Sequence, residues 1–329
     1  MQKTAYRLVN RHWLIDFYNC AYENLTNEKI PVVVPSYNRY ENNLFLDNVR
    51  KNMHEDWPIY VVVRQSQKKL YEKHYGDLAN VTFVAFKDED INNIGKTRIK
   101  IVDYFTKRFD NIITVDDDLQ MVIKTKAKST NPTYKILEKL FENKKLNDPA
   151  RIFAMWQLCH EHLITKYEGC YCTYAYIDSF IIDLDYSEDK SYNMGGKAIC
   201  AVCLNLKRMK KHKLNYLSST ETGHEDIDLI IRAMNYKMYP ISIKCIGFHG
   251  IISNNSVITK DMNFETVKDR VILQNKILLE KYKDNPYISM NKKDNLLFNW
   301  NRYLKDIGFN QELCGSIKKE VFNKLQKGN

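Results

Sequence analysis

In the first 120 residues, short runs of consecutive apolar residues alternate with longer stretches in which apolar residues recur every three or four positions. The short runs are rich in β-branched residues, which is typical of strands buried on both faces. The longer stretches have the period of amphipathic helices, and Gly76 is a stop signal for one of them. The pattern predicts strands at 30–35, 59–63, 81–86 and 112–115, and helices at about 41–52, 67–74 and 92–108.

This alternation indicates an α/β fold, a Rossmann-like, mixed but mostly parallel sheet with helices on both faces. Ligands bind such sheets at the carboxyl ends of the strands, near the point where the strand order reverses. There is no Gly-x-Gly-x-x-Gly and no Gly-Lys-Ser/Thr phosphate loop, which disfavours a dinucleotide-dependent dehydrogenase and a phosphate-loop NTPase. The residues expected at the strand ends and in the loops that follow are Pro35, Ser36, Tyr37, Arg39, Arg64, Gln65, Asp116, Asp117 and Asp118, most of them polar.

The second half of the chain continues with a predicted strand at 198–206, a helix at 226–234 and a strand that ends near 250. Residues 2–26 have a helical period, and the basic tail predicts helices at 264–282, 296–304 and 311–325. We therefore expect an N-terminal helical appendage (1–29), a main domain of two halves (30–120 and 121–252) and a C-terminal helical subdomain (253–329). A basic amphipathic helix also suits a membrane surface, but Trp300 alone supplies an interfacial tryptophan in this tail.

Composition narrows the class of protein. The 329 residues are 44% hydrophobic, which indicates a folded protein, and the net charge of +10 favours a polyanionic partner such as nucleic acid, a nucleotide or an anionic membrane surface. A Lys- and Asn-rich proteome would produce the same charge. The eight cysteines form no zinc-like pair of pairs, and there is no signal peptide or long apolar run. A reduced, cytoplasmic protein without a transmembrane segment is expected, and its oligomeric state cannot be read from the sequence.

The strand at 112–115 ends in three consecutive carboxylates, Asp116, Asp117 and Asp118. Adjacent negative charges repel one another and burial raises that cost, so a cation is expected nearby. Mg²⁺ and Mn²⁺ prefer carboxylate oxygens and often bind a diphosphate as well. The alternative is an acidic turn that caps the next helix.

Three segments follow in the order of the nucleotide-binding half of a GT-A fold glycosyltransferase. They are Val-Val-Pro-Ser-Tyr-Asn-Arg at 33–39, Gly-Lys-Thr-Arg at 95–98 and Val-Asp-Asp-Asp at 115–118. Within that fold the sequence most resembles the TET-associated glycosyltransferases of phages, which modify hydroxymethylated bases in DNA. The resemblance implies transfer of a sugar from a nucleotide-sugar, a UDP-sugar in particular, with 30–120 as the nucleotide-binding half and 121–252 as the acceptor half.

The same resemblance predicts a glycine loop, an acidic pair at the start of a helix and a late histidine. Gly195 and Gly196, then Glu225 and Asp226, then His249 occur in that order. A turn glycine, a carboxylate at a helix N-terminus and a core histidine would each explain one element alone. Their ordered coincidence with the aspartate triplet favours the glycosyltransferase.

The resemblance also implies roles for these residues. Asp118 and His249 would ligate Mn²⁺ or Mg²⁺, with Asp116 beside the metal or the ribose, and the metal would stabilise the departing diphosphate. Asp226 would be the base that deprotonates the acceptor hydroxyl, with Glu225 as its neighbour, which implies inversion at the anomeric carbon. The remaining donor-binding residues would be Pro35, Ser36, Tyr37, Arg39, Arg64, Gln65, Lys96, Arg98, Asp117, Gly195 and Gly196.

The acceptor depends on weaker features. A basic run precedes the acidic helix, and its members Lys207, Arg208, Lys210 and Lys211 are expected to flank the mouth of the site with Lys124, Lys126 and Lys128 and to grip phosphates. Trp156, Tyr171, Tyr174 and Tyr176 either hold an extruded base or belong to the core. The resemblance favours double-stranded DNA with modified bases, in the host cytoplasm if a phage encodes the protein.

Other acceptors and classes stay open from the sequence. A polysaccharide, a cell-wall polymer or a protein is the alternative acceptor of such a transferase. A nucleotidyltransferase also uses strand-end carboxylates with Mg²⁺, although it lacks support from the glycine, acidic-pair and histidine elements. A non-catalytic nucleic-acid-binding protein would explain the basic charge without any chemistry.

Overall fold

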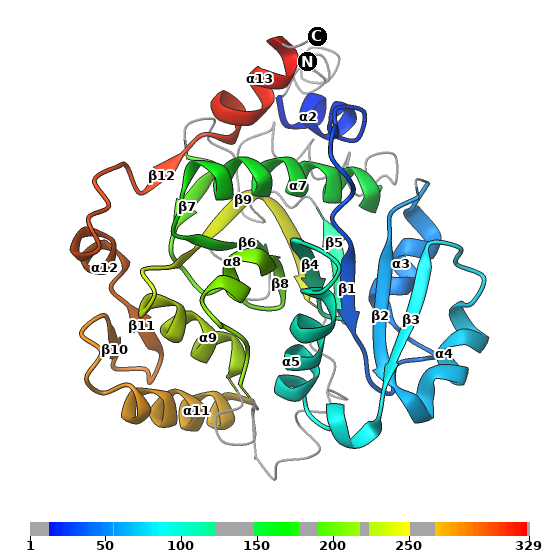
Figure 1. Cartoon of the computed structure of the whole chain (residues 1–329), viewed down its shortest axis with the longest axis horizontal. Coiled ribbons are helices and arrows are strands. Elements are labelled where there is room, and N and C mark those ends of the chain that lie inside the picture. Colours follow the sequence, from blue (N-terminus) through cyan, green and yellow to red (C-terminus); the bar gives the residue numbers. More distant parts are fainter. Residues whose placement is uncertain are drawn as a thin grey trace, which may run out of the picture.

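A computed structural model describes residues 13–54, 56–122, 148–177, 190–217, 224–250 and 267–327 of the chain (Figure 1). Its strands are β1 (Val32–Pro35), β2 (Ile59–Arg64), β3 (Val81–Phe86), β4 (Asn111–Val115), β5 (Leu119–Val122), β6 (Cys170–Ile177), β7 (Tyr192–Met194), β8 (Ala201–Asn205), β9 (Tyr239–Gly250), β10 (Ile288–Met290), β11 (Leu296–Phe298) and β12 (Cys314–Gly315). Its helices are α2 (Trp13–Ala21), α3 (Leu44–Asn52), η1 (Gln65–Gln67), α4 (Lys68–Tyr75), η2 (Asp88–Ile91), α5 (Ile94–Phe105), α7 (Pro149–Lys166), α8 (Leu206–Lys211), α9 (Glu225–Met234), α11 (Val267–Lys281), α12 (Trp300–Asp306), η4 (Lys318–Phe322) and α13 (Asn323–Lys327).

One large sheet runs through the molecule in the order β12-β7-β9-β6-β8-β4-β1-β2-β3, with β5 paired to β9. The strands β3, β2, β1 and β4 are all parallel. The chain moves outward from β1 to β3 and then crosses to the other side of β1, so the strand order reverses between β1 and β4. Binding sites form at such a switch point. Strand β8 is antiparallel to both of its neighbours, β4 and β6.

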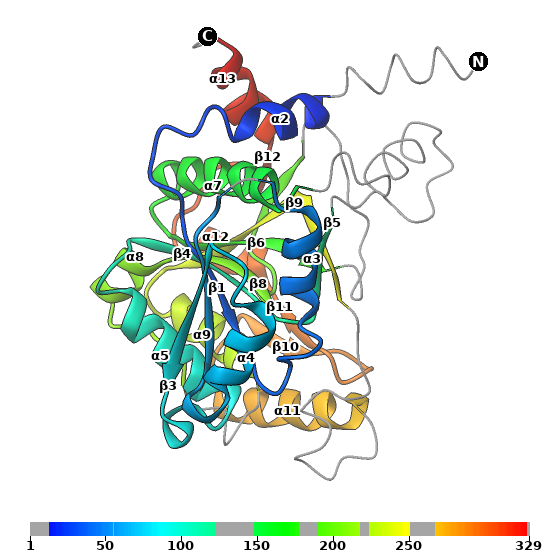
Figure 2. The same ribbon diagram turned by 90° about the vertical axis from the view of Figure 1, so that its right-hand side faces the viewer.

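The alternation of side chains along the strands divides the core between the two faces of the sheet. Val33 and Ile112 pack with residues of α5, α8 and α9. Val32, Val34 and Ile113 pack with residues of α2, α3 and α7 on the other face. Figure 2 shows α5, α8 and α9 on one side of the strands and α3 on the other. The continuous apolar runs in the sequence reflect this two-sided burial.

The two ends of the described chain meet on top of α7 (Figure 1). Phe17 of α2 packs against Phe322 of η4, with ring centroids 5.6 Å apart. Glu320 of η4 accepts hydrogen bonds from Lys166 (2.8 Å) and Tyr192 (2.9 Å). These contacts attach the C-terminal segment to the main domain.

The C-terminal part differs from the helical subdomain predicted from the sequence. It contributes β12 to the main sheet, where Cys314 pairs with Asn193, and it contains the hairpin of β10 and β11. These strands have two or three residues each, too few to show a period-two pattern.

The predicted fold class, a mixed α/β sheet flanked by helices, is confirmed, and its antiparallel strands lie in the second half of the chain. Helix α7 and strand β6 were not predicted, although Asp148 caps α7 and Pro149 occupies its first turn, which is a readable start signal. None of the helices in the described ranges is long and apolar enough to cross a membrane.

Candidate active site

The loop after β1 and the aspartate triplet after β4 meet at the switch point of the sheet. The carboxylate of Asp117 is held from both sides, because Oδ2 accepts a hydrogen bond from Ser36 (2.6 Å) and Oδ1 lies 3.2 Å from Arg39 Nε. Ser36 also contacts Tyr71 (2.7 Å) and accepts a hydrogen bond from Asn43 (3.1 Å). Asp117 and Ser36, both predicted to bind the donor, therefore fasten the two loops together.

The outer two aspartates are more open. The side chains of Asp116 and Asp118 are 25% and 32% exposed, against 12% for Asp117. Asp118 Oδ2 lies 3.3 Å from Arg39 Nη2, and Asp116 Oδ1 lies 3.1 Å from Arg98 Nη2. The triplet thus presents its first and third carboxylates to the site while the second is built into the loop.

Arg98 in α5 connects the triplet to the acidic pair of α9. Its Nη2 pairs with Asp116, its Nε lies 3.5 Å from Glu225 Oε1, and its Nη1 pairs with Asp226. Burial disfavours its charge, yet the attraction of Asp116 and Glu225 outweighs this and raises the pKa of Arg98. Arg98 is predicted from the sequence to bind the donor, whereas in the structure its guanidinium is occupied by three carboxylates.

Negative charge exceeds positive charge in this cluster. Asp116, Asp117, Asp118, Glu225 and Asp226 share two arginines, Arg39 and Arg98. Burial raises the pKa of all three aspartates of the triplet, that of Asp117 to about 7, against the opposing effect of the arginines.

A hard divalent cation fits this chemistry, because it would offset the excess charge and take the oxygens of Asp116 and Asp118. The described side chains contain no ready-made group of three metal-ligating residues. His249 lies on β9 with its backbone opposite Gln120, but its side chain is outside the described part.

An aromatic and cationic surface lies at the ends of β1 and β2. The guanidinium carbon of Arg64 lies 3.8 Å from the centroid of the Tyr37 ring, and Arg64 Nη2 donates to the carbonyl of Asn92 (3.1 Å). The amide of Asn38, a residue with φ of 56°, donates to Gln67 Oε1 (3.1 Å) and so fixes the loop. A half-exposed ring held over a cation suits stacking of a nucleotide base.

Two other predicted donor residues, Gln65 and Lys96, border this surface. Gln65 is exposed in η1 directly after β2, and Pro35 is the buried last residue of β1. Lys96 lies in the first turn of α5, which Asn93 caps through its side chain. Among the described residues Lys96 forms no ion pair, so its ammonium is available to an anion.

The predicted glycine loop packs against aromatic side chains of the protein. Gly195 and Gly196 have φ of 81° and 105°, which L side chains rarely adopt. A Cβ on Gly195 would collide with Trp300, and one on Gly196 would collide with the hydroxyl of Tyr174. The space that a side chain would need is therefore filled by these aromatic residues, and a role toward the donor sugar is not needed to explain the glycines.

The predicted acceptor residues lie at the opposite end of the strands from the aspartate triplet. Because β8 is antiparallel to β4, Ala201 pairs with Val115 beside the triplet, and Asn205 pairs with Asn111 at the far end. Helix α8, which carries Lys207, Lys210 and Lys211, starts directly after Asn205. The structure therefore places these lysines at the end of β4 opposite to the triplet, and their role toward the acceptor stays a prediction.

The guanidinium of Arg208, another predicted acceptor residue, is bound within the fold. It donates to the backbone carbonyls of Ile164 (3.4 Å), Tyr167 (3.2 Å) and Cys170 at the end of α7. Lys124, Lys126 and Lys128, and the side chain of Tyr176, lie outside the described residues. Trp156, Tyr171 and Tyr174 are buried and belong to the core, which was the second of the two expected roles.

Two residues of the site had no recognisable signal in the sequence. The carbonyl of Cys200 accepts a hydrogen bond from the amide of Asp116 (3.0 Å), and the ring of Tyr216 lies 5.6 Å from the guanidinium carbon of Arg98. Cys200 lies in the strand predicted at 198–206, and Tyr216 lies three residues after the basic run that ends at Lys213. Only the pairing of β8 with β4 brings Cys200 to the triplet.

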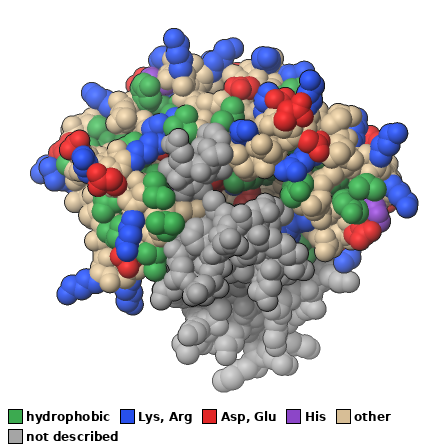
Figure 3. All heavy atoms as spheres, turned by 90° about the horizontal axis from the view of Figure 1, so that it is seen from below, with side chains coloured by type: hydrophobic (Ala, Val, Ile, Leu, Met, Phe, Trp, Pro, Cys, Tyr) green, Lys and Arg blue, Asp and Glu red, His purple; other side chains and the backbone are tan. Residues whose placement is uncertain are grey.

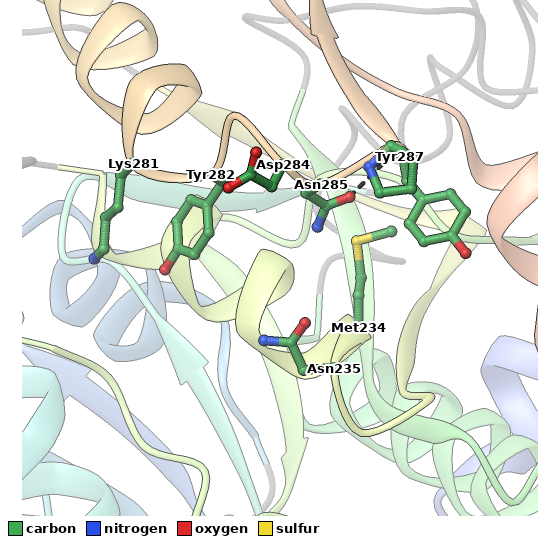
Figure 4. Close-up of a pocket in the computed structure, with 8 residues that line it drawn as sticks. Met234, Asn235, Lys281, Tyr282, Asp284, Asn285 and Tyr287 are labelled. Carbon is green, nitrogen blue, oxygen red and sulfur yellow. Dashed lines mark hydrogen bonds between the residues drawn. The ribbon is translucent and has the colours of Figure 1, made fainter.

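A cavity of about 330 Å³ lies elsewhere, between the carboxyl ends of α9 and α11 (Figure 4). Met234, Lys281, Tyr282 and Tyr287 line it, at the end of α9 opposite to Glu225. Figure 3 views the molecule from the side toward which β1 points, and there the coloured Lys and Arg side chains are interspersed with acidic and apolar ones.

Comparison with known proteins places these features in context. The sequence profile of the TET-Associated Glycosyltransferase family matches residues 30–238, more than half of the 329 residues. Curated protein sequences gave no match. The structure of S. aureus TarS 1-349 in complex with UDP-GlcNAc is 11% identical over 77% of this chain and 67% of that chain, with a TM-score of 0.45. A mycobacterial protein is 8% identical over 85% of both chains, with a TM-score of 0.43. GalNAc-T7 with UDP, GalNAc and Mn²⁺ is 11% identical over 92% of this chain and 58% of that chain, with a TM-score of 0.44.

Proposed function

The chain belongs to the TET-associated glycosyltransferase family, and from this premise we propose that it transfers a sugar from a UDP-sugar to a hydroxymethylated base of double-stranded DNA, with a divalent metal ion and with inversion. As a member of that family it is a glycosyltransferase. Family membership thus decides between this class and the nucleotidyltransferase or non-catalytic protein that the sequence left open.

The observation that carries the proposal is the ion-pair network around Arg98. It joins residues from three distant parts of the chain, namely Asp116 after β4, Arg98 in α5 and the pair Glu225 and Asp226 at the start of α9. Carboxylates for a metal and a carboxylate for proton transfer are thereby held in one cluster at the switch point of the sheet.

The donor diphosphate is anionic, and the cluster has excess negative charge. Asp116 and Asp118, with His249 as the third ligand, would hold Mn²⁺ or Mg²⁺, and the metal would stabilise the charge on the leaving diphosphate. Lys96, in the first turn of α5, would contribute a cation toward the donor diphosphate. Tyr37 and Arg64 would stack on the base of the donor.

Asp226 is the proposed base. Its Oδ1 pairs with Arg98, and no hydrogen bond or ion pair to another described residue occupies Oδ2, so Oδ2 can accept the proton of an acceptor hydroxyl. Direct attack by that hydroxyl breaks the bond between the anomeric carbon and the diphosphate and inverts the configuration. Glu225 is more buried, at 7% side-chain exposure against 13%, and fits the role of its supporting neighbour.

Incubation of the protein with labelled UDP-sugars, Mn²⁺ and duplex DNA tests the whole proposal. Label is expected in a duplex that contains hydroxymethylated bases and not in the matched unmodified duplex. Absence of label from both duplexes with every donor would reject the DNA acceptor. A glycan or protein substrate labelled in its place would identify the alternative.

The metal assignment has its own test. Asp118→Ala is expected to lower transfer by about 100-fold or more, because a metal ligand is lost. Asp77→Ala is the matched control, because it removes an exposed carboxylate. Among the described residues, Asp77 forms an ion pair only with Arg50, at 2.5 Å. Turnover of the Asp118 variant equal to that of the control would contradict the assignment.

A further inference from the structure

Exposed cations gather at the amino end of β4. They lie on the face of the sheet where Figures 1 and 2 show the helices α5, α8 and α9. We name them, with one exposed tyrosine, the amino-edge patch. It consists of Lys107, Arg108, Lys207, Lys210, Lys211, Lys213, Tyr236 and Lys237, all of which are exposed.

Three elements bring the patch together. The amide of Lys207 donates to the carbonyl of Asp110 (3.2 Å), which places the turn after α5, with Lys107 and Arg108, beside the start of α8. At the other end of α8, the rings of His212 and Tyr236 lie 5.4 Å apart, which brings the turn after α9 against it. The patch is therefore continuous from the end of α5 to the end of α9.

Few acidic groups offset this charge. Asp110 is 71% exposed and lies 3.8 Å from the ammonium of Lys207, which is itself 78% exposed. Asp103 accepts a hydrogen bond from Asn215 (2.8 Å). Among the described residues the other lysines of the patch form no ion pair. Exposed pairs contribute little to stability, so the fold does not require these charges.

We propose that the amino-edge patch binds the phosphate backbone of duplex DNA, at a distance from the base that is modified. The inference rests on the proposed DNA acceptor and assigns the polymer a second contact. The exposed cations are complementary in charge to the phosphates, and the exposed ring of Tyr236, at 46%, gives a contact for sugar or base edges.

The separation of the patch from the carboxylate cluster suits this role. Ten residues of helix and turn separate Arg98 from Arg108 in the sequence, roughly 15 Å at the helical rise. This corresponds to about four base pairs of duplex. The patch contacts no reacting group, and its attraction would raise the local concentration of acceptor without regard to sequence.

The test is binding of an unmodified, fluorescently labelled DNA duplex, measured by anisotropy over a range of salt concentrations. The triple variant Lys207→Gln, Lys210→Gln, Lys211→Gln is expected to weaken binding about tenfold or more at low salt and to reduce the salt slope by about 2 to 3. The control is Lys305→Gln, Lys324→Gln, Lys327→Gln, which removes the same charge from exposed positions on α12 and α13. Circular dichroism melting verifies that both variants fold.

Equal affinities and salt slopes for the two triple variants would overturn the proposal, because net charge alone would then explain the binding. Loss of binding to anionic phosphatidylserine vesicles with unchanged DNA binding would also overturn it, in favour of a membrane surface. The measurement needs neither donor nor metal. Failure of glycosyl transfer therefore contradicts the proposed function, whereas equal DNA binding contradicts the amino-edge patch.

Discussion

The two ends of β4 carry opposite charge in opposite settings. At its carboxyl end, Asp116, Asp117 and Asp118 are largely buried and share arginines that lie within 3.3 Å. At its amino end, the lysines of α8 are exposed, and Lys207 has its nearest carboxylate at 3.8 Å. Five residues of strand separate these two settings.

The difference shows how burial decides what a charge can do. Buried charges interact strongly and must be paired, so they fix geometry and suit chemistry. Exposed charges are screened and act mainly through their summed field on a polyanion. Two half-buried arginines at these ends differ in their partners instead, because Arg98 pairs with carboxylates beside the triplet while Arg208 donates to backbone carbonyls from α8.

The largest effect is expected from Asp226→Asn. An amide cannot accept the proton of the acceptor hydroxyl, so kcat should fall by about 10²- to 10⁴-fold, which steady-state transfer assays will measure. Asp228→Asn is the matched control. Asp228 is bound by Lys281, Tyr282 and Arg232 at 2.6 to 2.7 Å, so its substitution should lower the melting temperature and not kcat. A loss of kcat confined to the Asp228 variant would refute the base assignment.

Removal of Arg98 is expected to have the next largest effect. Arg98→Ala leaves three carboxylates without their shared cation and should lower the free energy of unfolding by about 3 to 5 kcal/mol, as measured by urea denaturation. Arg208→Ala at the other end of β4 loses hydrogen bonds to carbonyls and should cost about 2 kcal/mol. The comparison of the two ends fails if the Arg208 variant is the less stable one.

The smallest effect concerns the histidine that anchors the amino end of β4. His160 Nε2 contacts Asn111 Oδ1 (3.1 Å) and Nδ1 contacts Thr173 Oγ1 (3.0 Å), while Trp156 donates to the same hydroxyl (3.0 Å). A neutral imidazole with its proton on Nε2 satisfies this arrangement, because Nε2–H donates to Asn111 Oδ1 and the Thr173 hydroxyl donates to Nδ1. Burial, aided by the charge of Arg208, lowers the pKa of His160 to about 3.

Below the ordinary histidine pKa of about 6.5, His160 binds a proton in the unfolded chain but stays neutral in the folded protein. Lowering the pH therefore destabilises the fold. The free energy of unfolding should fall by about 2 kcal/mol between about pH 7 and pH 5 through this group alone. Denaturant titrations at both pH values will measure it. His160→Gln cannot titrate, and a variant with the same pH dependence as the native protein would contradict this origin.

The sequence was informative where the signals are local. The strands β1 to β4 and the helices α3, α4, α5 and α9 lie within a few residues of their predicted positions, because side-chain period and caps such as Asn93 act over a single turn. The acidic strand end was visible for the same reason. Helix α7 was missed although Asp148 and Pro149 mark its start.

Contacts between distant segments decided the rest. The sequence by itself determined that a buried strand ends in three aspartates and that a basic run and an acidic helix follow. Only the tertiary structure decided that Asp117 is fastened to Ser36, that Arg98 pairs with a carboxylate 128 residues away, and that the basic run lies at the opposite edge. The physical reason is that the antiparallel register of β8 against β4 arises from packing, which no local pattern of residues encodes.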